Sequence, residues 1–228
     1  MSVRAEWITI GGDVEAWRSI GLTVSPDGVV ALLGTSLRIV SPDHGRGVIG
    51  WSLSGPRPNI PASVPESGTD DGENAAPDDA TPSIDGLRTE WIEAAGPMYA
   101  AHPSGASSLD HVVVLTPDLE RTSGAIAEAT GYELRRIREV GSMRQGFHRI
   151  GDRGEGGLIV ELVERPDIEP GPAAFWGIVL IVDDLDAACD LIGPDRISPP
   201  KDAVQPGRRI ATVRSDAGLE IPVALMTG

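Results

Sequence analysis

A strand–turn–helix pattern occurs twice in the second half of this chain, and it restricts the possible folds more than any other feature. In residues 109–119, LDHVVVLTPDL, polar His111 opens an apolar strand, a proline-containing turn ends it, and a helix-compatible segment runs over 119–130. The same order returns over 177–192, with Gly177 at the position of the histidine. The chain therefore repeats a structural unit without repeating its most reactive side chain.

Strands with turn signals follow each copy, and a third, less similar copy lies at the N-terminus. This order predicts an α+β fold built from βαβββ units rather than alternating β and α elements. A segment rich in proline and acidic residues interrupts the pattern, and its composition predicts a disordered loop. We expect a degenerate βαβββ-like unit, the acidic loop, a strand with a connector, a βαβββ unit with His111, and a βαβββ unit without it, over residues 1–55, 56–83, 84–108, 109–166 and 173–228.

The amino-acid composition limits the kinds of molecule that this protein can bind. The 228 residues carry a formal net charge of -15 with a pI of about 4.6, which disfavours binding to nucleic acid or to anionic membranes. No stretch approaches the 18 apolar residues of a membrane span, and the first residues do not resemble a secretory signal. The single Cys189 cannot form an internal disulfide, which is consistent with a reducing compartment. We expect a cytoplasmic protein.

The segments LDHVVV and LIVELVE, at the two ends of the unit over 109–166, resemble the vicinal oxygen chelate superfamily. That superfamily includes glyoxalase I, extradiol dioxygenases, methylmalonyl-CoA epimerase and bleomycin-resistance proteins. The likeness extends over 109–226, and the whole chain looks like uncharacterised glyoxalase-like proteins of actinobacteria. It implies two units joined edge to edge into a cupped, incomplete β-barrel with helices outside and a cleft inside. The N-terminal unit would pack on this barrel or mediate a homodimer.

The resemblance also implies a metal site. In the metal-dependent members, ligands come from the first and last strands of the units, and His111 and Glu161 match those positions. They would suit one divalent ion, such as Zn, Mn, Ni or Fe. The matching positions of the last unit, Gly177 and Ala224, carry no donor, so the ligand set is incomplete and the site can equally be free of metal. His102 and His148 are the histidines that could complete the set.

Several side chains have both a chemical and a structural interpretation. His111 can be a metal ligand, a polar cleft residue or a structural histidine, and a buried Glu161 beside it would make a general base with a raised pKa. The alternation along the strand that contains Phe147 favours Gln145 facing the cleft. Trp176 can stack on a ligand or pack in the core. Arg208 can hold an anionic substrate group or lie at a solvated strand end.

Two functions follow from these patterns. One is a glyoxalase-like enzyme, a lyase, isomerase or dioxygenase or a relic of one, with His111 and Glu161 as its catalytic residues. The other is a metal-free protein that binds or sequesters a small molecule, as bleomycin-resistance proteins do. A regulatory module without a ligand is a third interpretation. The sequence contains no phosphate-binding glycine loop, paired-cysteine zinc site or Gly-x-Ser-x-Gly nucleophile motif.

Overall fold

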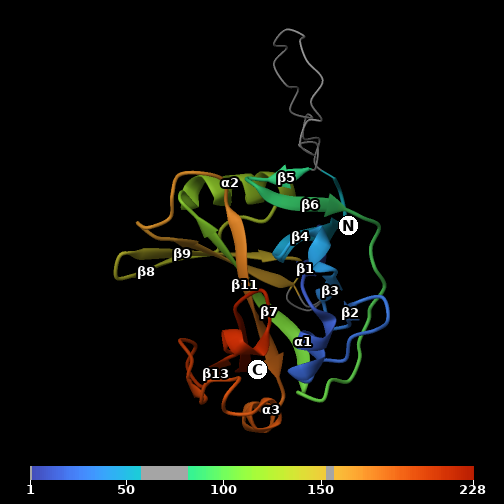
Figure 1. The fold of residues 1–228 in the computed structure, drawn as a ribbon. Helices are drawn as coiled ribbons and strands as arrows, with labels where there is room; N and C mark the ends of the chain where they lie inside the picture. The colour runs from blue at the N-terminus through green and yellow to red at the C-terminus, as the bar shows by residue number, and fades with distance from the viewer. Residues whose placement is uncertain (1, 58–81, 153–156) are drawn as a thin grey trace, which may run out of the picture.

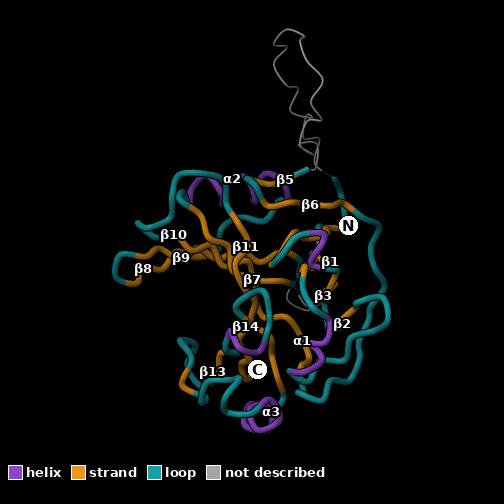
Figure 2. Tube along the Cα trace, viewed as in Figure 1, coloured by secondary structure: helices purple, strands orange, loops and turns teal. Residues whose placement is uncertain are grey.

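Two open β-sheets with few helices form the fold, as the sequence predicts for an α+β protein (Figures 1 and 2). The computed structural model describes residues 2–57, 82–152 and 157–228. Most of the acidic segment for which disorder was expected lies outside the described residues. None of the helices in the described ranges has the length and apolarity needed to cross a bilayer.

The larger sheet has eight strands in the order β12-β13-β14-β11-β7-β10-β9-β8. Its strands are β7 (Ala106–Thr116), β8 (Arg136–Val140), β9 (Met143–Ile150), β10 (Leu158–Glu164), β11 (Ala174–Val182), β12 (Lys201–Asp202), β13 (Arg209–Thr212) and β14 (Val223–Thr227). The first and last strands of each unit pair in parallel, β7 with β10 and β11 with β14. The two first strands, β7 and β11, pair antiparallel at the centre. This is the expected edge-to-edge joining of two βαβββ units.

The two helices of these units begin and end where the sequence predicts. They are α2 (Leu119–Thr130) and α3 (Leu185–Ile192), and the side chains of Asp118 and Asp184 accept hydrogen bonds from backbone N–H groups of their first turns. Helix α2 ends at Gly131, whose positive φ of 75° suits glycine. Local capping chemistry therefore fixes both helices.

The smaller sheet has six strands in the order β2-β3-β1-β4-β6-β5. They are β1 (Arg4–Gly11), β2 (Val29–Val30), β3 (Ser36–Val40), β4 (Gly47–Ser54), β5 (Ser83–Ile84) and β6 (Leu87–Trp91), with helix α1 (Val14–Ser19) after β1 and short 3₁₀ turns at Pro42–His44 and Ser215–Ala217. Strand β4 pairs antiparallel with β1 and parallel with β6.

That pairing differs from the expected N-terminal unit. The final strand of a βαβββ unit lies parallel to its first strand, as β10 lies parallel to β7, whereas β4 runs antiparallel to β1. Strand β4 instead occupies the place that β11 occupies in the larger sheet. The six-stranded sheet thus repeats the pairing plan of the eight-stranded sheet with fewer strands.

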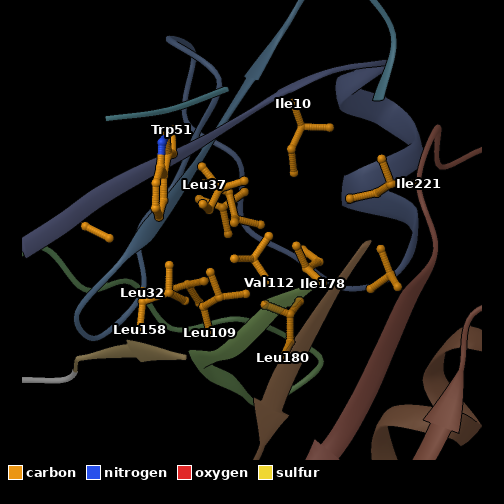
Figure 3. Close-up of a cluster of buried hydrophobic side chains, with 14 of the residues drawn as sticks. Ile10, Leu32, Leu37, Trp51, Leu109, Val112, Leu158, Ile178, Leu180 and Ile221 are labelled. Atoms are coloured by element: carbon orange, nitrogen blue, oxygen red, sulfur yellow. The ribbon is translucent and has the colours of Figure 1, made fainter. Parts of the chain in front are cut away.

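A single hydrophobic core fills the space between the two sheets (Figure 3). Ile10, Leu37 and Trp51 of the smaller sheet lie opposite Val112 and Ile178 of the larger one. Trp17 and Trp51 are fully buried in this core. The smaller sheet therefore packs on one face of the larger sheet and does not cover the other face.

A two-residue turn ties the smaller sheet to helix α2. Asp85 and Gly86 join β5 to β6, and both have positive φ, as type I′ hairpin turns require. The Asp85 carboxylate accepts hydrogen bonds from Arg121 and Thr122 of α2, which lies beside β5 (Figure 1). These hydrogen bonds connect the smaller sheet to α2, in addition to the hydrophobic core that the two sheets share.

Candidate functional site

A β-bulge in β7 brings two adjacent side chains to the same face of the large sheet. Val179 of β11 pairs with His111, but the next residue, Leu180, pairs with Leu109, so Asp110 is the extra residue. Simple alternation would point Asp110 and His111 to opposite faces, whereas a bulge lets both project the same way. We call the face that carries His111 the site face; it is opposite the face packed on the six-stranded sheet.

His111 lies between two carboxylates. Its Nδ1 is 2.7 Å from Asp110 Oδ2, and its Nε2 is 3.3 Å from Glu161 Oε2. The side chains of His111 and Glu161 are only 12% and 14% exposed. Because an ionised Asp110 can only accept at Nδ1, this nitrogen carries a hydrogen, and Nε2 faces Glu161.

Glu161 reaches the site from β10, the strand next to β7. Its Oε1 accepts a hydrogen bond of 2.7 Å from Gln145 Nε2 on β9. Burial raises the pKa of the Glu161 carboxyl group, and the charge of Asp110 adds to this, while His111 and Arg138 oppose it. Glu161 therefore binds a proton more readily than an exposed glutamate does.

Arg208 completes the network from the loop before β13. Its Nη1 donates a hydrogen bond of 3.0 Å to Asp110 Oδ1. Burial alone would raise the pKa of Asp110, but the hydrogen bonds from His111 and Arg208 outweigh it and hold that pKa below its usual value. Asp110 thus stays ionised and fixes the His111 ring. Asp110 was not among the predicted site residues, because regular alternation points neighbouring side chains of a strand to opposite faces.

The donors present do not fit a divalent metal ion. Asp110 and Glu161 contact opposite nitrogens of the His111 ring, so the two carboxylates cannot converge on one ion at either nitrogen. Strand pairing places Gly177 and Ala224 at the positions that correspond to His111 and Glu161. No group of three or more His, Cys, Asp or Glu side chains within the described ranges is arranged to hold a metal.

The two histidines that could have completed a metal site lie elsewhere. His102 accepts a hydrogen bond from Thr23 N, and its Nε2 is 3.0 Å from the carbonyl oxygen of Ala31. His148 is fully buried on the core-facing side of β9, between Ser123 and the Tyr132 carbonyl. Burial lowers the pKa of both histidines, with their backbone hydrogen bonds opposing it. Both histidines are structural.

Phe147 and Trp176 occupy different parts of the large sheet. Phe147 pairs with Glu161, so its side chain lies on the site face; the core-facing residues of β9 are Gly146, His148 and Ile150. Trp176 is the extra residue of a second bulge, between Phe175 and Gly177. It is 46% exposed, which rules out the packed-core interpretation. Phe175 packs on Trp51, whereas the exposure of Trp176 places its side chain outside the main core.

A small apolar cluster lies beside the charged network. Val179 of β11 pairs with both His111 and Ala224, and it packs with Ala224 and Met226 apart from the main core. Ile181, Ala203 and Ile210 extend this cluster. The site face therefore combines a charged half, on β7 to β10, with an apolar half, on β11 to β14.

Comparisons with known proteins found similarity in structure only. No family model and no curated protein matches this chain. Methylmalonyl-CoA epimerase from Mycobacterium tuberculosis aligns with a TM-score of 0.45 and 15% identity over 54% of this chain and 89% of that one. A Streptomyces coelicolor methylmalonyl-CoA epimerase in complex with 2-nitronate-propionyl-CoA aligns with a TM-score of 0.44 and 20% identity, over 54% of this chain and 98% of that one. A hypothetical protein from Bacillus halodurans aligns with a TM-score of 0.42 and 13% identity, over 53% of this chain and 94% of that one.

All three matches are at most 20% identical to this chain in sequence. Similarity at this level concerns the arrangement of strands and helices and not the chemistry of the site. The function has to come from the side chains themselves.

Proposed function

We propose that this protein is a metal-independent acid–base enzyme that moves a proton on a carbon next to a carbonyl group, as an isomerase does. The observation that carries the proposal is the hydrogen-bonded chain Arg208–Asp110–His111, with Glu161 facing the free nitrogen of His111. Two proton-accepting atoms, Nε2 of His111 and Oε2 of Glu161, lie 3.3 Å apart. Such a pair is stable when it holds one proton between the two groups.

The shared proton gives the pair two forms. In one form Glu161 is protonated and His111 is neutral; in the other Glu161 is a carboxylate and His111 is an imidazolium ion stabilised by Asp110. The ionised form has a base and an acid side by side. Glu161 takes the proton from the substrate carbon, the C–H bond breaks, and His111 Nε2–H donates a hydrogen bond to the developing enolate oxygen. Return of the proton to the carbon restores both residues.

Neighbouring residues prepare the pair for this step. Asp110 holds the imidazole ring and its tautomer, as a buried aspartate does in a catalytic triad. Arg208 keeps Asp110 ionised, and Gln145 holds the second oxygen of Glu161 so that Oε2 faces the histidine. Asp110, His111, Gln145 and Glu161 sit on strands of one sheet, which keeps their geometry rigid, and Arg208 lies directly before β13 of the same sheet.

Exchange of substrate hydrogen with deuterated water tests the proposal. The full-length protein is incubated in D₂O with a panel of carbonyl compounds that have an acidic α-hydrogen, and exchange is followed by proton NMR. We expect catalysed exchange, reduced roughly 10²- to 10⁴-fold by Glu161→Gln and by Asp110→Asn. Equal exchange in wild type and Glu161→Gln, or none across the panel, would contradict an enzyme of this type.

One observation favours binding without catalysis as the second candidate function. On the site face, half-buried Ile181 and Ile210 pack against the buried cluster of Val179, Ala224 and Met226, and Trp176 is exposed on the same unit. These surfaces can hold an apolar or aromatic ligand without proton transfer. In that case Trp176→Ala weakens ligand binding at least tenfold, whereas Glu161→Gln leaves it unchanged.

A further inference from the structure

The eight-stranded sheet places an arginine beside the proposed catalytic pair. Arg138 lies on β8, at the edge of the sheet, and pairs directly with Gln145 of β9. Residues that pair directly across strands project to the same face, so Arg138 shares the site face with Gln145 and Glu161. Gln145 donates to Glu161 and thus lies between the arginine and the carboxyl group.

The guanidinium group of Arg138 has hydrogen-bonding capacity left over. It is half-buried, and it donates no hydrogen bond to any of the residues that the structure describes. Other arginines of this acidic protein donate to carboxylates, as Arg144 does to Glu120 and Arg209 to Asp186. The charge of Arg138 acts on Glu161, but Glu161 directs its oxygens to Gln145 and His111. The N–H groups of the planar Arg138 guanidinium are therefore available to a bound ligand.

Arg208, the second arginine near the site, has a different task. Its Nη1 is engaged with Asp110, and it approaches the network from the side of β13, opposite to β8. It acts on His111 through Asp110 and is a positioning residue. The two arginines thus flank the Glu161–His111 pair from opposite sides, and only Arg138 is uncommitted to a protein carboxylate.

We propose that Arg138 binds the carboxylate of an anionic carbonyl substrate, bidentately, and so places the carbon next to the carbonyl over Glu161. A guanidinium fork matches the two oxygens of a carboxylate, and the half-buried setting strengthens that bond relative to one in water. The net charge of -15 repels anions from most of the surface, so an anion that binds here needs a specific cationic partner. The reaction assigned to this substrate rests on the proposed function, but the anion binding is measured without turnover.

Calorimetric titration of the full-length protein with pyruvate, at constant ionic strength, tests the anion site. Methyl pyruvate is the neutral control, since it keeps the carbonyl and loses the charge. We expect saturable binding of pyruvate, at least tenfold weaker in Arg138→Gln, and at least tenfold weaker binding of methyl pyruvate to the wild type. The matched control is Arg88→Gln, which removes an exposed arginine from the six-stranded sheet and leaves the pyruvate affinity unchanged.

Three results would overturn the assignment: no saturable binding to the wild type, equal affinity in Arg138→Gln, or an equal loss in Arg88→Gln, which would indicate general charge attraction. A second measurement avoids dependence on the folding of a variant. The Nε–H resonance of Arg138, identified by its loss in Arg138→Gln or Arg138→Lys, is expected to shift and saturate with pyruvate. A failed exchange reaction with intact pyruvate binding rejects the enzyme and keeps the anion site.

Discussion

Glu161 links the site to the pH dependence of stability. Its pKa is raised in the folded protein, so the group contributes stability that is fully present below the unfolded pKa of about 4.5 and is lost as pH rises through the folded value. Wild type should therefore lose stability relative to Glu161→Gln as the pH increases above about 4.5. Thermal unfolding of both proteins across this range measures the difference.

The exposed Glu139 provides the control for that comparison. Glu139→Gln lies on β8 outside the network and controls for the removal of one carboxylate charge over the same pH range. A constant stability difference between wild type and Glu161→Gln would show that Glu161 titrates as an ordinary exposed glutamate, and would remove the electrostatic support for a general base.

His148 should give the opposite pH dependence. Burial lowers its pKa, although the hydrogen bond to the Tyr132 carbonyl opposes this, so protonation of the folded state is unfavourable. Its contribution to stability is present above the unfolded pKa of about 6.5 and is lost as pH falls below it. His148→Asn should cost about 1–3 kcal/mol at pH 8, and less at pH 5.

Denaturant unfolding at the two pH values measures this change. The exposed His44→Asn serves as the control for the replacement of a histidine by asparagine. A cost for His148→Asn that does not diminish between pH 8 and pH 5 would contradict the buried neutral histidine.

At the scale of the element, the pairing of β11 with β14 explains why the second unit lacks a catalytic side chain. A Cβ atom added at Gly177 would lie 2.6 Å from the Pro222 carbonyl oxygen, closer than such atoms approach. Gly177→Ala should therefore destabilise the protein by about 1–3 kcal/mol, because the two strands must separate. Gly171→Ala is the control, since nothing lies within 4 Å of its Cβ position.

Equilibrium unfolding in urea measures both variants. Equal stability of Gly177→Ala and Gly171→Ala would mean that β14 moves freely, and that a second histidine could be introduced at 177 without penalty. The expected outcome instead makes the asymmetry of the two units a property of the backbone.

At the scale of the whole molecule, one core joins the two sheets, so the described parts should unfold together. Four of the five tryptophans lie in the part of the chain that forms the six-stranded sheet and α1, so fluorescence reports mainly on that part, whereas circular dichroism reports on both sheets. We expect coincident transitions from the two probes, as in cooperative unfolding. Two separate transitions would show that the sheets are independent domains.

A fragment that begins at residue 94 supplies a second check at this scale. Removal of the six-stranded sheet exposes the apolar face that contains Val112, Ile178 and Leu180. We expect this fragment to aggregate or to bind a hydrophobic dye, since a patch of this kind is rarely left open in a soluble protein. A stable, monomeric fragment would contradict the shared core.

The sequence predicted most of the local structure, because local signals specify it. The bounds of α2, α3 and β10 agree with those expected from the apolar pattern, and the structure adds the capping aspartates of both helices. The joining of two βαβββ units was also predicted, as an implication of the resemblance of residues 109–226 to the vicinal oxygen chelate superfamily. Division of the chain into five segments and the roles of the site residues stay predictions.

Pairing between distant strands decided what the sequence left open. The bulge that turns Asp110 beside His111 exists because β7 and β11 differ in register, and no local pattern encodes that register. The antiparallel pairing of β4 with β1, and the place of Arg138 across from Gln145, likewise depend on partners far along the chain. The sequence by itself thus determined the elements and the two reactive residues, and the tertiary structure determined which side chains surround them.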